Sequence, residues 1–181
     1  MNKNFILLFL SLFIMTIAHS QESANGPMDK TILEQADHMG RLFIAKDYAA
    51  FIKYTHPAVL AQMGGEEKLL QTVKESFSAL EAEGVTFLNV TFTAPSLVVV
   101  HDNELQCTLS QAIEMKVVGG TMTVYATLIA VSRDGGKNWY FVDTAGNDLQ
   151  NMGRLISNLS PALVLPEAME PAFVNDPEVK P

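Results

Sequence analysis

The stretch ELQCTLSQAIEMKVVGGTMTVYATLIAVSR, residues 104–133, reads as two long β-strands joined by a pair of glycines. Apolar and polar residues alternate through most of it, which is the period of a strand with one covered face. The alternation predicts strands at 104–118 and 121–133, with Gly119-Gly120 as a two-residue hairpin turn. The same period extends outward into shorter expected strands at 85–93, 96–101 and 138–144.

The half of the chain before these strands has the spacing of helices instead. Apolar residues recur at intervals of three and four from 28 to 45 and from 66 to 83, so each segment is expected to form an amphipathic helix. A shorter helix is expected after Asp47, a typical capping residue, and a brief one after Pro57. Helices followed by strands indicate an α+β fold, with the helices packed on one face of an antiparallel sheet.

The two ends of the chain differ from this middle part. Lys3, a long apolar run and Ala18-His19-Ser20 are typical of a secretory signal peptide cleaved before Gln21, with an uncleaved anchor as the alternative. We therefore expect export to the periplasm or the extracellular medium. The expected segments are a signal peptide at 1–20, a polar leader at 21–27, a single domain at 28–160 and a proline-rich, extended or disordered tail at 161–181.

Charge and cysteine content restrict the partners. The chain has 12 Lys and Arg against 20 Asp and Glu. Lys3 is the only charged residue of 1–20, so the mature chain would have 11 basic residues and a net charge of −9. Such a surface disfavours nucleic acid and anionic membranes. Cys107 is the single cysteine and lies on the apolar side of its strand, so we expect a buried hydrophobe, with a nucleophile or an intermolecular disulfide as alternatives.

The strand register gives Asp143 a special place. If Gly119-Gly120 alone forms the turn, Gln111 pairs with Leu128 on the mostly apolar face, which is expected to lie under the helices. A second hairpin around Gly135-Gly136 pairs Leu128 with Asp143, so these three residues would form one row on the covered face. A carboxylate there needs polar partners, water or an opening to solvent.

The candidate site is built around this row. Phe141 and Trp139 alternate with Asp143 on the same face, which favours the inward orientation over a one-residue bulge that would turn the acid outward. Tyr54 and His56 end the second helix, from where side chains can point at the sheet. The candidate ligand-binding residues are Gln111, Asp143, Tyr54, His56, Trp139 and Phe141. If the protein is an enzyme, Asp143 would be the general base and Tyr54 or His56 the acid.

The opposite face of the sheet is expected to be open. The turn at Asp102-Asn103 pairs His101 with Glu104 as an exposed charge pair, while Val100 and Leu105 face inward. An exposed patch carrying Tyr125, Ile129 and Val131 would suit a homodimer. The mature chain has three histidines without a metal-ligand spacing and no nucleotide-binding motif, so neither a metal nor another cofactor is expected.

A short motif follows the second long strand. SRDGGKNW, residues 132–139, satisfies S-x-D-x-G-x-x-W and so resembles the Asp-box of sialidases and other secreted β-proteins. The resemblance implies a hairpin turn in which Asp134 binds loop amides and Trp139 lies beneath them. We interpret the motif as a structural turn and not as a sign of glycosidase activity.

The order of elements also suggests a family. AKDYAAFIKYTHP at 45–57 and NWYFVD at 138–143 resemble the second helix and the closing strand of secreted bacterial members of the nuclear transport factor 2-like superfamily, the cystatin-like α+β cone. The resemblance implies a cone-shaped cavity between the helices and a curved sheet. It leads us to expect an exported, non-catalytic domain that binds a small apolar ligand or a protein partner. A cavity enzyme of the lyase or isomerase type and a homodimerising scaffold are the alternatives.

Overall fold

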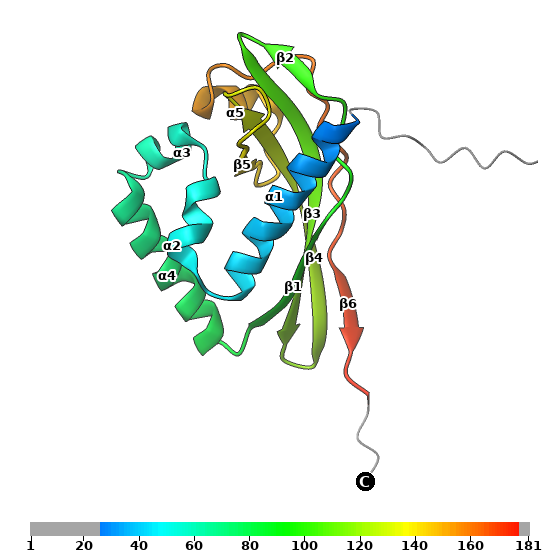
Figure 1. The fold of residues 1–181 in the computed structure, drawn as a ribbon. Coiled ribbons are helices and arrows are strands. Elements are labelled where there is room, and N and C mark those ends of the chain that lie inside the picture. Colours follow the sequence, from blue (N-terminus) through cyan, green and yellow to red (C-terminus); the bar gives the residue numbers. More distant parts are fainter. Residues whose placement is uncertain (1–25, 178–181) are drawn as a thin grey trace, which may run out of the picture.

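Two long strands, β3 (Glu104–Val117) and β4 (Gly120–Ser132), form the hairpin around which the fold is built (Figure 1). β1 (Thr86–Phe92) and β2 (Val99–His101) pair with opposite ends of β3, whereas β5 (Tyr140–Asp143) and β6 (Ala172–Asn175) pair with opposite ends of β4. Every ladder of this curved six-stranded sheet is antiparallel. The structure, a computed structural model, describes residues 26–177, so the expected signal peptide and most of the polar leader lie outside the described residues.

Four helices and a 3-10 turn precede the sheet and lie over one of its faces (Figure 1). Asp47 caps the second helix as expected, because its Oδ1 accepts a hydrogen bond from the Ala50 amide at 3.1 Å. The predicted α+β class, with N-terminal helices on one face of an antiparallel sheet, is confirmed. The elements are α1 (Pro27–Ile44), α2 (Tyr48–Phe51), η1 (Ile52–Tyr54), α3 (Pro57–Gln62) and α4 (Glu66–Ala82).

The main core lies between α1 and the sheet. Gly40 lets α1 approach β1 closely, since a Cβ added there would lie 3.2 Å from the Cβ of Val90. Cys107 is 0% exposed and burial raises the pKa of its thiol to about 12, so it is the inert buried hydrophobe that we predicted. The buried residues of this core are Ile32, Ala36, Met39, Cys107, Leu109, Leu128, Ala130, Trp139 and Phe141.

The opposite face is covered as well, which corrects the expectation of an open outer surface. Ile129 and Val131 are both 0% exposed, because α5 (Leu149–Leu155) and the segment after it pack on them, while Tyr125 stays half-buried. Polar side chains of β3 hold that segment through its backbone. Gln106 Nε2 donates to Asn158 O at 2.6 Å, and Thr108 Oγ1 donates to Val164 O at 2.9 Å.

The predicted register of the long hairpin was wrong by two residues. Val117 pairs with Gly120, so the turn is Val118-Gly119, and Gln111 lies opposite Ala126 instead of Leu128. A shift of two preserves the face of every side chain, because the side-chain period of a strand is two. The predicted β4–β5 register is confirmed, with Leu128 opposite Asp143. The row on the covered face is therefore Leu109, Leu128 and Asp143.

The short β2–β3 hairpin has the predicted pairing and different surroundings. His101 does lie opposite Glu104, but Glu104 is buried and its Oε1 accepts a hydrogen bond from Arg133 Nε at 2.7 Å. Val100, which we expected to face the core, is 74% exposed. Burial at this end depends on α5 and on Arg133, which lie outside the hairpin, so the local pattern could not predict it.

β6 was not predicted, because its sequence was assigned to the tail. Its docking requires a glycine at position 120: a Cβ there would overlap the carbonyl oxygen of Val174 and lie 2.7 Å from Phe173 Cζ. The Asp176 amide also donates to Gly119 O at 2.9 Å, and Lys116 forms an ion pair with Asp176. β6 and Asp176 are thus held against the turn of the long hairpin.

We expect Gly120→Ala to release β6 without unfolding the rest of the protein. The added methyl group overlaps backbone, which cannot rotate away as a side chain can, so amides of 172–175 should exchange hydrogen like those of a locally unfolded segment. Gly153→Ala is the matched control, since nothing lies within 4 Å of a Cβ placed there. Unchanged protection of β6 in Gly120→Ala would contradict this account of the docking.

Candidate functional site

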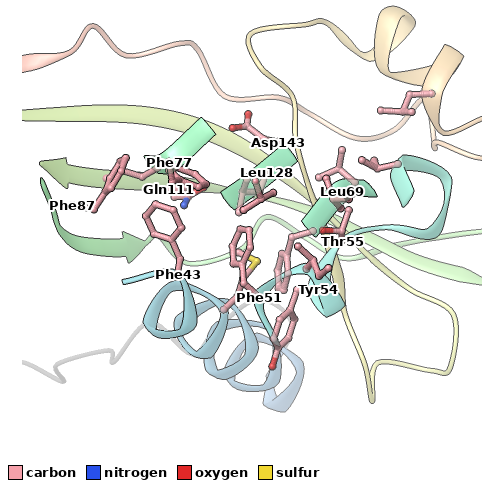
Figure 2. A pocket seen from close by; sticks show the side chains of 18 residues that line it. Phe43, Phe51, Tyr54, Thr55, Leu69, Phe77, Phe87, Gln111, Leu128 and Asp143 are labelled. Atoms are coloured by element: carbon pink, nitrogen blue, oxygen red, sulfur yellow. The ribbon is translucent and has the colours of Figure 1, made fainter. Parts of the chain in front are cut away.

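A cavity of about 380 Å³ lies between the helices and the inner face of the sheet (Figure 2). Its walls are mostly apolar and come from every layer of the fold. The helical side, including η1 and the residue after it, contributes Met39, Phe43, Phe51, Ile52, Tyr54, Thr55, Val59, Leu69, Val73, Phe77 and Leu155. The strands contribute Phe87, Gln111, Ile113, Leu128, Phe141, Val142 and Asp143.

Three phenylalanines gather at one end of the cavity (Figure 2). The ring centroid of Phe43 lies 4.8 Å from that of Phe77 and 4.9 Å from that of Phe87, and the Phe77–Phe87 distance is 5.3 Å. All three pairs meet edge to face, the arrangement that the ring quadrupoles favour. This cluster joins α1, α4 and β1 and forms an apolar wall of the cavity.

Helix α4 forms the wall opposite the sheet. It packs on α2 and η1 and, through Phe77, on Phe87 of β1, and its apolar residues Leu69, Val73 and Phe77 line the cavity. Leu69 is buried, while Val73 and Phe77 remain half-buried. The sequence predicted an apolar stripe on this helix, of which Leu80 is 37% exposed and does not line the cavity. A stripe that lines a cavity has the same spacing as one that fills a core.

Two polar side chains in the walls lack partners. The side-chain amide of Gln111 is half-buried and makes no hydrogen bond to any other part of residues 26–177. The hydroxyl of Thr55 likewise has no hydrogen bond within the described chain, although the backbone of Thr55 bridges to Phe141. Neither group is fully buried, since every buried side-chain nitrogen and oxygen of the described residues has a hydrogen bond, so both are open to water or to a polar atom of a ligand.

Asp143 lies at the rim of the cavity. It shares the inner face of the sheet with Phe141 and Leu128, yet its side chain is exposed. The cavity is therefore open to solvent at this carboxylate, as we expected for an acid on the covered face. Its Oδ1 accepts a hydrogen bond from the Ala145 amide at 2.7 Å. Figure 2 shows the carboxylate at the edge of the group of lining side chains.

Tyr54 lines the cavity with its ring but directs its hydroxyl elsewhere. The hydroxyl oxygen lies 2.7 Å from Nδ1 of His38, an exposed residue of α1. Figure 2 shows the hydroxyl on the side away from the other lining residues. Burial raises the pKa of Tyr54. The Tyr54 ring therefore lines the cavity, while the hydroxyl is held by His38.

His56 does not line the cavity, which corrects the prediction. It is 0% exposed, its Nδ1 accepts a hydrogen bond from the Ala58 amide at 3.2 Å, and its Nε2 lies 3.2 Å from Arg133 Nη2. Burial and the Arg133 charge lower the pKa of His56 to about 4. Its neighbours Arg133 and Glu104 come from the ends of β4 and β3, so no local pattern around His56 indicated this orientation.

Trp139 is also outside the cavity, although Phe141 lies inside it as predicted. The indole is 1% exposed in the main core, and its Nε1 donates to Gly136 O at 3.0 Å. Asp134 Oδ1 accepts hydrogen bonds from the Asn138 amide at 2.9 Å and from the Lys137 amide at 3.1 Å. These bonds lower the pKa of Asp134 to about 2. The structural turn that the Asp-box resemblance implied is confirmed.

Two kinds of feature are absent from the described part of the chain. Within residues 26–177, no three His, Cys, Asp or Glu side chains are grouped so as to hold a metal ion, and no helix has both the length and the apolar character needed to cross a membrane. Comparisons of the chain with protein families, curated proteins and solved structures found no match.

Proposed function

We propose that this protein binds a small, largely apolar ligand in the cavity between its helices and its sheet. The cavity itself carries this proposal: its walls are mostly apolar, and the Gln111 amide in them has no hydrogen bond within the described residues and is not sealed from a molecule of the size of water. Apolar walls with a few convergent polar groups are the usual composition of ligand sites. The volume of about 380 Å³ lies near the lower end of the roughly 300–1,000 Å³ typical of such sites, which favours a small ligand.

We also propose a family and a cellular location for the protein. We propose membership of the nuclear transport factor 2-like superfamily, supported by the element order and by helices that cover a curved sheet around a cavity. Export is proposed from the amino-terminal pattern alone. Both assignments agree with a ligand-binding domain and neither depends on a reaction.

A cavity enzyme is the second candidate, because Asp143 lies at the rim of an apolar cavity. General acid–base chemistry also needs a positioned acid or polarising group within hydrogen-bond reach of the substrate. The Tyr54 hydroxyl is held by His38, and Nδ1 of His56 is occupied by the Ala58 amide while its Nε2 lies beside Arg133. Binding therefore has more support than catalysis.

Val73→Trp should block the cavity. Val73 projects from α4 into the space opposite the sheet, so an indole there would occupy the volume that a ligand needs. We expect the affinity for the fluorescent apolar probe N-phenyl-1-naphthylamine to fall by at least about ten-fold. Native mass spectrometry of protein purified from its own host should likewise show a small-molecule adduct in the wild type and none in the variant.

Leu80→Trp is the matched control for that experiment. Leu80 lies on the same helix, is 37% exposed and does not line the cavity, so the same indole there should leave probe binding unchanged. Equal binding by the wild type and Val73→Trp would place the probe elsewhere and overturn the proposed site. Loss of binding in both variants would point to a general disturbance of α4.

A further inference from the structure

The only charged side chain in the cavity walls is negative. Among the 18 residues that line the cavity, Asp143 is the only one from the Asp, Glu, Lys, Arg and His classes (Figure 2). A ligand carboxylate would meet no cation in these walls and would face the Asp143 carboxylate at the rim. The chain as a whole also carries a net charge of −8, which favours the approach of cations over anions.

The Asp143 carboxylate has capacity for a further partner. Its Oδ1 accepts the Ala145 amide, whereas its Oδ2 has no hydrogen bond or ion pair to the rest of the described chain. The side chain is exposed at the rim, and its cross-strand neighbour Leu128 belongs to the cavity wall. Directly opposite residues on one face of a sheet have adjacent side chains, so a charge bound at Asp143 lies beside the apolar space.

The aromatic walls favour the same sign of charge. Five phenylalanines and the Tyr54 ring line the cavity, and the faces of such rings carry negative potential that attracts ammonium groups. The Gln111 side chain also offers a carbonyl oxygen that can accept a hydrogen bond from an N–H group. The phenylalanines are Phe43, Phe51, Phe77, Phe87 and Phe141.

We propose that the ligand is an apolar amine. Its uncharged body occupies the space among the phenylalanines, and its ammonium group binds the Asp143 carboxylate at the rim. This inference rests on the proposed function and adds the chemical class of the ligand. Neutral molecules of the same shape bind less tightly, and carboxylates such as fatty acids bind least.

Three probes that share one ring system test the charge preference. They are 1-naphthylmethylamine, 1-naphthalenemethanol and 1-naphthoate, which are a cation, a neutral molecule and an anion near neutral pH. Titration calorimetry should show the amine binding about ten-fold more tightly than the alcohol, with 1-naphthoate weakest. The preference of the amine over the alcohol should shrink as salt is added, because the carboxylate is exposed.

Asp143→Asn should bring the amine down to the affinity of the alcohol and leave the alcohol unchanged. Asparagine keeps a side-chain oxygen that can accept the Ala145 amide, so the loop after β5 should persist. Asp102→Asn is the matched control: it changes the net charge equally in an exposed turn outside the cavity, where φ is 44° and asparagine is well tolerated. It should not alter the order of the three probes.

The outcomes separate the two proposals. If the alcohol binds, Val73→Trp abolishes that binding and the amine has no advantage, the amine inference is overturned while the binding site stands. The same holds if Asp143→Asn leaves the amine advantage unchanged, or if Asp102→Asn reduces it equally. If none of the three probes binds to the wild-type protein, the proposed function itself is overturned.

Discussion

Replacing Trp139 by alanine should lower the free energy of unfolding by about 3–5 kcal/mol, a large part of the stability of a domain of this size. The indole is 1% exposed and packs in the core between α1 and the sheet. Its removal leaves a cavity there and also deprives Gly136 O of its hydrogen-bond donor. Because Trp139 is the single tryptophan, unfolding of this variant must be followed by circular dichroism in urea instead of by tryptophan fluorescence.

Trp139→Ala should also weaken the contact between the Asp-box turn and α1. Gln35 Nε2 donates to Lys137 O at 2.8 Å, and Gln35 Oε1 accepts from the Trp139 amide at 2.9 Å, so one side chain pairs with the turn as a neighbouring strand would. Trp139→Phe keeps an aromatic ring and these backbone bonds, and should cost about 1–2 kcal/mol. A loss below about 1 kcal/mol for Trp139→Ala would show that the turn and the core are not coupled through the indole.

Acidification should destabilise the protein through His56. The unfolded chain takes up a proton on this residue near pH 6.5. In the folded chain, burial and secondly the Arg133 charge lower the pKa of His56 to about 4, although the Glu104 charge acts in the opposite direction. The contribution is therefore fully present above about pH 6.5 and is lost as the pH falls toward about 4. This loss amounts to about 3 kcal/mol. The Tyr140 ring also meets the imidazole nearly at a right angle, with ring centroids 6.2 Å apart.

The geometry explains why protonation is unfavourable. Nδ1 must stay unprotonated to accept the Ala58 amide at the start of α3, and a cationic imidazole would lie against the Arg133 guanidinium. His56→Asn should keep a capping acceptor and remove the titration, so its stability should change much less between about pH 7 and about pH 4.5. Urea denaturation at both pH values is the measurement. An equal pH slope in the two proteins would assign the effect to other groups.

Asp134 gives a separate acid response at lower pH. Hydrogen bonds from Asn138, and then from Ser132 and Lys137, lower its pKa from 3.8 to about 2, so its contribution to stability is present above about pH 4 and is lost below it. This interval lies below that of His56. The two effects are therefore distinguishable in one titration series.

Local sequence signals predicted the frame of the cavity. The period of two assigned each side chain of β3 and β4 to a face, and the assignment survived an error of two residues in the turn because parity was unchanged. Asp143 was placed opposite Leu128 by this argument, and the structure has this pair. The Asp-box turn was recognisable for the same reason, since Asp134 binds amides only three and four residues away.

Contacts between distant segments determine the empty volume of the cavity and the orientations of Tyr54 and His56. Leu69, Val73 and Phe77 have the same spacing whether α4 rests on the sheet or stands away from it, so the pattern predicted an apolar face and could not predict a cavity. The orientations of Tyr54 and His56 depend on His38 and Arg133, which lie 16 and 77 residues away in the chain. Side-chain periodicity is a local property of the backbone, whereas an empty volume and the direction of a hydrogen bond depend on which other segments come near, and these became known only from the packed chain.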